Sequence, residues 1–183
     1  MTQHDQILAQ ASKWREIGVF TYACKVDLEW GIRKLHKNSI KITDAVFSNP
    51  ALLPEDYNFL ALDLENSEIV CLDIEGNPGS VEDFMGFLEE KSINLSDFLV
   101  EKTLNNGLHI YFRHNKVRRR ENIFAMELKR IRFDVLCRGK AFTFPSYLGK
   151  KKYIPMFNME GKFDSDKIVD IPEAIYNEFF KKR

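Results

Sequence analysis

The sequence predicts an α+β protein with mainly antiparallel sheets and flanking helices, organised as a single domain over residues 1–183. Two observations carry this prediction. Short runs of β-branched and aromatic residues are separated by turn residues and interspersed with a few segments of helical spacing. Because parallel strands need long crossover connections, runs that follow one another this closely favour antiparallel pairing. A chain of 183 residues is also long enough to bury one hydrophobic core.

The first half of the chain predicts helices at 3–17, 39–47 and 80–91 and strands at 18–23, 57–64 and 68–75. The first helix has apolar residues such as Ala11 and Trp14 near helical spacing, and Gly18 ends it. Alternating β-branched and aromatic residues indicate the strand that follows. The turn-prone residues 65–67 join the two later strands, and Ser80 is a good N-cap for the third helix.

The second half predicts strands at 98–103, 108–113, 123–129, 131–136, 141–144 and 153–157 and a last helix at 173–181. The Asn-Asn-Gly sequence at 105–107 predicts a tight turn that can supply a positive φ. Residues 114–121 are basic and predict a loop or hairpin tip. Pro145 interrupts the strands, and Pro172 opens the last helix at a first-turn position.

The composition is that of an ordinary globular protein, with 44% hydrophobic and 30% charged residues. No apolar run approaches the roughly 18 residues of a membrane span, and the polar N-terminus lacks the apolar segment of a secretory signal. The cysteines Cys24, Cys71 and Cys137 are odd in number and widely spaced, so neither a disulfide framework nor a zinc site is indicated. These features favour a reducing cytoplasm and no membrane partner.

The formal net charge of zero conceals an asymmetry along the chain. Residues 1–112 carry 9 basic and 18 acidic residues, which gives a net charge of −9. Residues 113–152 carry 13 basic and 3 acidic residues, a net charge of +10, and residues 153–183 carry 5 and 6, a net charge of −1. Concentrated positive charge suggests a polyanion as partner, although a solvated basic surface gives the same count.

Two carboxylates stand one residue apart at the end of a predicted strand. Side chains alternate faces along a strand, so Asp73 and Glu75 point the same way and Ile74 points to the opposite face. The two acids repel each other, and a divalent cation would relieve that repulsion, since Mg²⁺ is commonly held by one or two carboxylates plus substrate phosphates. The alternative is a strand end that leaves two acids in water.

Two further strands carry chemistry-bearing side chains. His109 alternates with apolar neighbours and therefore lies on the more polar face of its strand. Asp134 is flanked by Phe133 and Val135, an environment that favours a carboxylate with a cation or a donor to face. Each has a plainer interpretation: an ordinary polar-face histidine, and a salt-bridge partner for a neighbouring arginine such as Arg132.

Together these segments resemble the archaeo-eukaryotic primase superfamily, and within it the bifunctional primase–polymerase domain of plasmid and phage replication proteins. The family pattern is an apolar strand ending in Asp-x-Asp or Asp-x-Glu, a Ser/Thr-x-x-Gly-x-His strand, an apolar-Asp strand, and a Pro-Ser step followed by a Tyr. Over roughly residues 10–160 this chain supplies Asp73 and Glu75, Thr103, Gly107 and His109, Asp134, Pro145 and Ser146, and Tyr153, in that order.

The resemblance implies a metal-dependent DNA primase and polymerase whose catalytic core contains an RRM-like unit. Asp73, Glu75 and Asp134 would be the catalytic carboxylates and the ligands of Mg²⁺ or Mn²⁺, because nucleotidyl transfer uses two divalent cations about 3.5–4 Å apart. The residues expected to bind the nucleoside triphosphate are Thr103, Asn106, Gly107, His109, Arg132 and Ser146. Basic residues between Arg113 and Lys152 would follow the backbone of a single-stranded DNA template.

The resemblance also implies a replicative helicase as a partner, and residues 1–183 contain no G-x-x-x-x-G-K-S/T loop. Two alternatives belong to other functional classes. The domain could be a non-catalytic module that binds single-stranded DNA and works with that helicase. It could also be a metal-dependent nuclease, since acids with a histidine suit phosphodiester hydrolysis as well.

Overall fold

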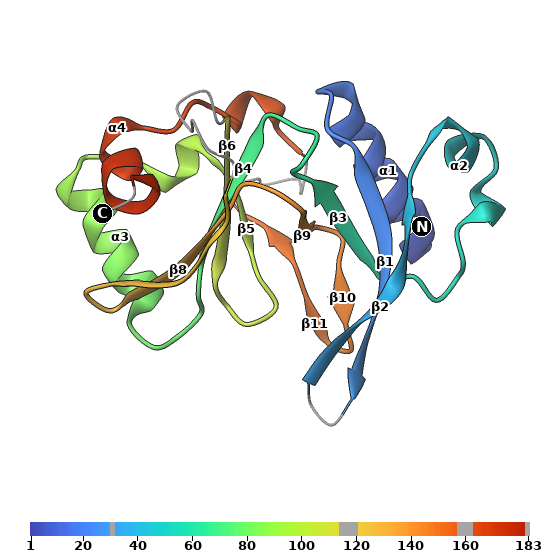
Figure 1. Cartoon of the computed structure of the whole chain (residues 1–183), viewed down its shortest axis with the longest axis horizontal. Helices are drawn as coiled ribbons and strands as arrows, with labels where there is room; N and C mark the ends of the chain where they lie inside the picture. The colour runs from blue at the N-terminus through green and yellow to red at the C-terminus, as the bar shows by residue number, and fades with distance from the viewer. Residues whose placement is uncertain (30–31, 114–120, 157–162, 182–183) are drawn as a thin grey trace.

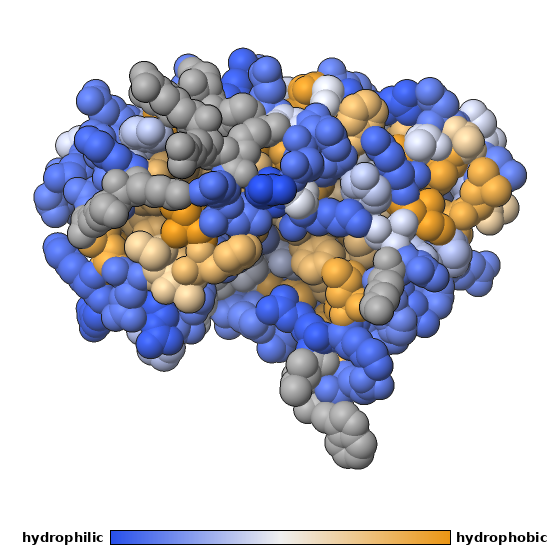
Figure 2. Space-filling view, viewed as in Figure 1, coloured by the Kyte–Doolittle hydropathy of each residue, from blue (hydrophilic) through white to orange (hydrophobic). Residues whose placement is uncertain are grey.

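The computed structural model describes residues 1–29, 32–113, 121–156 and 163–181 and has the predicted α+β architecture with mostly antiparallel sheets. Two main sheets stand side by side, with α3 (Ser80–Glu90) and α4 (Glu173–Ile175) on the outer side of one sheet, α2 (Asp44–Ser48) on the outer side of the other, and the N and C marks on opposite sides of the molecule (Figure 1). Most of the face seen in Figure 2 is hydrophilic, and hydrophobic residues reach the surface near the middle of the view. None of the helices in the described ranges is long and apolar enough to cross a membrane.

The larger sheet has six strands in the order β12-β5-β6-β4-β8-β7, and every neighbouring pair is antiparallel. The strands are β4 (Ile69–Ile74), β5 (Leu99–Lys102), β6 (Leu108–Arg113), β7 (Ile123–Leu128), β8 (Ile131–Leu136) and β12 (Ile154–Pro155). One face packs against the helix α3 (Ser80–Glu90), the short α4 (Glu173–Ile175) and the π-helical turn that continues it (Tyr176–Phe180).

The smaller sheet has the order β2-β1-β3-β9 and is also antiparallel throughout. Its strands are β1 (Thr21–Glu29), β2 (Ile32–Lys41), β3 (Phe59–Asp63) and β9 (Lys140–Thr143). The helix α1 (Gln3–Glu16) packs on it, and α2 (Asp44–Ser48) follows β2. The remaining elements are the small hairpin β10 (Tyr147–Leu148) and β11 (Lys151–Lys152) and three 3₁₀ turns, Pro50–Leu52, Leu95–Asp97 and Ser165–Lys167.

One hydrophobic core joins the two sheets. It contains Leu60 and Leu62 of β3, Cys71 of β4, Tyr111 of β6 and Trp14 of α1. The ring of Trp14 meets that of Tyr111 edge to face, with ring centres 5.5 Å apart. Since this core draws on both sheets, burial of its apolar surface holds them together.

Most predicted elements are confirmed with small shifts of their ends, but several are wrong. The predicted strand at 18–23 begins at Thr21 and continues to Glu29 as β1. The helix predicted at 39–47 is instead the end of β2 followed by the five residues of α2. The sequence pattern does not indicate β2, because its charged residues have low strand propensity and pairing with β1 overrides that propensity.

Residues 65–67 join two strands as predicted, and these strands belong to different sheets. Two smaller corrections concern how elements begin and end. The N-cap of α3 is Gly79, and Ser80 is the first helical residue, with its hydroxyl bonded to the backbone of Arg132. Of the strand predicted at 153–157, only the two residues of β12 pair with a neighbour, and position 157 lies outside the described residues.

Candidate active site

A row of polar side chains crosses four strands of the larger sheet. Glu101 of β5 is the register partner of His109 on β6, His109 pairs with Asp73 on β4, and Asp73 pairs with Asp134 on β8. Register partners share a face of the sheet, so all four side chains stand on the same face. Ile74 is buried in the core on the opposite face, as the alternation in sequence predicts.

Two glycines bring the turns at the end of this row into contact. A Cβ at Gly76, just after β4, would lie 1.8 Å from the carbonyl oxygen of Asn105. A Cβ at Gly107, just before β6, would lie 2.2 Å from the carbonyl oxygen of Ile74. The turn between β5 and β6 is closed by Thr103, whose hydroxyl accepts from the Gly107 N–H at 3.1 Å, and Asn106 takes the positive φ of 64°.

The row ends in a pocket of about 270 Å³ between these turns and the β1–β2 hairpin. Five of the predicted site residues line it, namely Asp73, Glu75, Thr103, His109 and Asp134. The remaining lining residues are Arg33, Gly76, Asn77, Leu104, Asn105 and Tyr153. Segments more than a hundred residues apart in sequence therefore supply one pocket, and most of its lining is polar.

His109 is held between two hydrogen-bond acceptors. Its Nδ1 lies 3.0 Å from the carbonyl oxygen of Phe142, and its Nε2 lies 3.3 Å from Oδ2 of Asp73. An acceptor at each ring nitrogen matches the doubly protonated imidazolium. Burial acts to lower the pKa of His109, but the negative charge of Asp73 and its hydrogen bond to the ring outweigh burial and hold that pKa well above its usual range. Because burial raises the pKa of the Cys71 thiol, that side chain is neutral and Asp73 supplies the attraction.

Behind His109, Glu101 forms a buried hydrogen-bond network. It accepts from the hydroxyl of Tyr111 at 2.9 Å, from the hydroxyl of Thr143 at 2.7 Å and from the Phe144 N–H at 3.2 Å. Burial raises the pKa of Glu101, although these donors act against it. Thr143 belongs to β9 of the smaller sheet, so the network fastens the second sheet beside the site.

The carboxylates at the open end of the row suit a hard divalent cation. Burial and the negative charge of Asp73 raise the pKa of Asp134, while its hydrogen bond from the Ala125 N–H at 2.7 Å lowers it. Mg²⁺ and Mn²⁺ prefer oxygen ligands such as carboxylates. A bound cation would also offset the repulsion between these neighbouring acids. Within the described residues, no three His, Cys, Asp or Glu side chains already surround one point, so these acids are not a preassembled metal cage.

Four of the predicted nucleotide-binding residues do not line the pocket. Arg132 is exposed and pairs with Glu127 at 3.4 Å. Ser146 is fully buried, where its hydroxyl accepts from the Leu60 N–H at 3.0 Å. Asn106 and Gly107 shape the turn beside the pocket, and the close approach that Gly107 permits is to the backbone of β4.

Two contributors, Arg33 and Glu101, are not identified by the sequence reasoning, and a third, Lys151, is predicted only as one of the basic residues between Arg113 and Lys152. Arg33 of β2 brings a cation to the pocket from the other sheet, and it makes no ion pair with the side chains that the structure describes. Lys151 lies beside the pocket, where its Nζ reaches Oδ1 of Asn105 at 3.3 Å. Glu101 belongs to no recognisable sequence motif, and only its pairing with His109 between β5 and β6 places it in the polar row. The predicted basic loop, with Arg118, Arg119 and Arg120, lies outside the described residues except for its last position.

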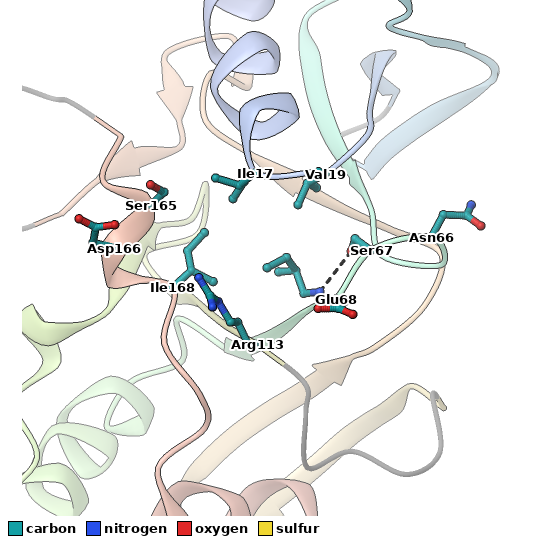
Figure 3. A pocket seen from close by; sticks show the side chains of 11 residues that line it. Ile17, Val19, Asn66, Ser67, Glu68, Arg113, Ser165, Asp166 and Ile168 are labelled. Atoms are coloured by element: carbon teal, nitrogen blue, oxygen red, sulfur yellow. Dashed lines mark hydrogen bonds between the residues drawn. The ribbon is translucent and has the colours of Figure 1, made fainter.

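A larger pocket of about 570 Å³ lies at the other end of β4 (Figure 3). It is lined by residues from the end of α1, the turn before β4, and the 3₁₀ turn at Ser165–Lys167, with Arg113 and Glu68 among them. Apart from Arg113 of the basic stretch, it contains none of the predicted site residues. The smaller pocket is the candidate active site because the carboxylates and the histidine meet there.

Comparison with models of known protein families finds no match for this chain, and comparison with curated protein sequences also finds none. A functional conclusion therefore rests on the chemistry and geometry of the pocket.

Proposed function

We propose that this chain is a metal-dependent DNA primase and polymerase that joins nucleoside triphosphates on a single-stranded DNA template. The observation that carries the proposal is the meeting of Asp73, Asp134 and His109 on one face of the larger sheet, in a pocket that also takes Glu75. These residues come from three separate motifs of the sequence, and their convergence is what a shared catalytic role requires.

The chemistry follows from the residues in the pocket. When bound, Mg²⁺ or Mn²⁺ lowers the pKa of an attacking 3′-hydroxyl and neutralises charge on the triphosphate. Asp73, Glu75 and Asp134 would hold the cations through their carboxylate oxygens. Arg33 presents charged N–H donors to the phosphates. His109, whose two ring nitrogens already face Phe142 and Asp73, lines the same pocket and adds positive charge beside the leaving pyrophosphate.

Two further features support the proposal. The strand order β5-β6-β4-β8, with α3 following β4, is consistent with the RRM-like unit that the family resemblance implies. Lys151 and Arg33 add positive charge at the rim of the pocket, which suits a nucleic-acid backbone. We place this activity in the cytoplasm, with a replicative helicase as a partner.

The proposal is tested by removing two carboxylates without changing their shape, in Asp73→Asn combined with Glu75→Gln. Loss of an outer-shell partner of a metal ligand already costs about 10–100-fold, so primer extension should fall by more than about 100-fold. Mn²⁺ binding, measured by electron paramagnetic resonance, should weaken in the same variant. The matched control is Asp97→Asn combined with Glu55→Gln, which removes one Asp and one Glu charge from exposed positions away from the pocket.

Extension at the rate of the control would contradict the assignment of these carboxylates. Shortening of a labelled strand by the unmodified protein, with Mg²⁺ but without nucleotides, would instead indicate a nuclease.

A second candidate function is a module that binds single-stranded DNA without catalysis. The ion pair between Asp73 and His109 favours it, because a carboxylate satisfied by the protein itself has less need of a cation. Filter binding with labelled single-stranded DNA separates the two functions. Binding indifferent to Mg²⁺ and nucleotide, with no incorporation of labelled nucleotide, would favour the module.

A further inference from the structure

An exposed aromatic ring lies next to the carboxylate end of the candidate site. Phe124 of β7 is 60% exposed and belongs to none of the core clusters of the described chain. Its neighbours Ile123 and Leu128 on the same strand do pack against the core. A single exposed aromatic ring is ordinary on a protein surface, so what matters is where this ring lies.

A β-bulge sets that position. The register between β7 and β8 moves from Ile123 opposite Val135 to Met126 opposite Phe133. Phe124 and Ala125 therefore both stand opposite the single residue Asp134. Ala125 has a φ of 52°, and its N–H donates to Asp134 at 2.7 Å, so the carboxylate itself anchors the bulge. Phe124 is the residue immediately before Ala125, whose N–H makes that hydrogen bond.

The order of strands places the ring at one end of the polar row. His109 on β6 comes first, then Asp73 on β4, Asp134 on β8, and the bulge on the edge strand β7. Phosphates held in the pocket beside Arg33, Thr103 and His109 would lie toward the β6 end of the row. The β7 end is then left for another part of the substrate.

The basic residues in the described segment that contains β7 indicate which part that is. Residues 121–152 carry 8 basic and 3 acidic residues, a net charge of +5. Arg132, on the neighbouring strand, is more than half exposed and pairs with Glu127 of β7 at 3.4 Å. Solvent-facing aromatic rings among basic residues are the means by which proteins hold single-stranded nucleic acid, since every base offers a flat face to stack on. We propose that Phe124 stacks on a base of the single-stranded template and positions the strand beside Asp134.

This inference rests on the proposed function, and binding of single-stranded DNA in the absence of metal and nucleotide tests it directly. Phe124→Ala should raise the dissociation constant of a labelled 20-nucleotide strand, measured by fluorescence anisotropy, by about 5- to 100-fold. Phe124→Trp should bind as the unmodified protein does, because it keeps an aromatic face. Phe124→Leu, which keeps apolar area without that face, should behave like the alanine variant and serves in its place if alanine impairs folding.

The matched control is Phe20→Ala, which removes another exposed phenylalanine, 43% accessible, that precedes β1. Binding of single-stranded DNA by Phe124→Ala or Phe124→Leu as tight as that of the unmodified protein would overturn the inference, and so would an equal loss in the Phe20→Ala control. The outcome is independent of the catalytic proposal. If Asp73→Asn with Glu75→Gln still extends primers while Phe124→Ala loses binding, the catalytic proposal fails and the stacking surface stands.

Discussion

The carboxylates of the polar row differ in how deeply they are buried and in the hydrogen-bond donors that surround them. Asp73 is 28% exposed at its side chain and faces the pocket, whereas Glu101, in the same row, is only 3% exposed. Glu101 meets its burial with donors alone: two hydroxyls and one backbone N–H. A buried carboxylate that faces three donors is stable only while both of its oxygens can accept hydrogen bonds.

Glu101→Gln should therefore destabilise the protein although it preserves the size of the side chain. The amide nitrogen would face the donors of Tyr111, Thr143 or Phe144, and a buried donor left unpaired costs about 1–3 kcal/mol. The free energy of unfolding from urea titration measures the effect. Glu55→Gln is the exposed control and should change stability little; an equally stable Glu101→Gln protein would show that the network does not hold the site.

At the scale of elements, the contact between two turns positions the site. The turn after β4 carries Glu75, and the turn before β6 carries Thr103. Their backbones approach so closely at Gly76 and Gly107 that no side chain fits between them. Both turns therefore depend on glycine for lack of space, and neither glycine has a positive φ.

Gly107→Ala should destabilise the protein, by about 1–3 kcal/mol, because its Cβ would overlap the backbone of Ile74 and Gly76. The matched control is Gly86→Ala in the middle of α3, where the added Cβ meets nothing within 4 Å. That control should gain about 0.5–1 kcal/mol, since alanine favours a helix over glycine. Urea unfolding of both variants checks the opposite signs, and two changes of the same sign would contradict the explanation.

At the scale of the whole molecule, the two sheets share a core and a hydrogen-bond network. Trp14, Leu60 and Tyr111 bury their side chains in the same cluster. Thr143 of the smaller sheet donates to Glu101 of the larger one. Neither sheet can be exposed without disrupting contacts of the other, so we expect them to unfold together.

Unfolding in urea should accordingly follow one transition by two probes. Trp30→Phe leaves Trp14 as the only tryptophan, whose fluorescence then reports on the core between the sheets. Far-ultraviolet circular dichroism reports on secondary structure throughout the chain. Midpoints that coincide are the expected result, and a fluorescence midpoint at clearly lower urea would indicate that the sheets separate first.

Sequence patterns were sufficient where burial leaves a clear apolar signature. Helix α3 has one apolar face, and β4 is a short apolar run that is buried on both faces. The alternation around Asp73 and His109 correctly predicts which side chains share a face. Pattern reasoning failed for β2, whose charged residues look unlike a strand and whose structure depends on its partner β1.

What the sequence alone determined was the architecture class, most elements and the candidate acids with their histidine, because local periodicity and motif spacing record them. Only the tertiary structure decided that Asp134 registers with Asp73, that Arg33 arrives from the other sheet, and that Arg132 and Ser146 lie away from the pocket. The physical reason is that strand order and register arise from long-range packing of whole faces. No local stretch of sequence contains that information.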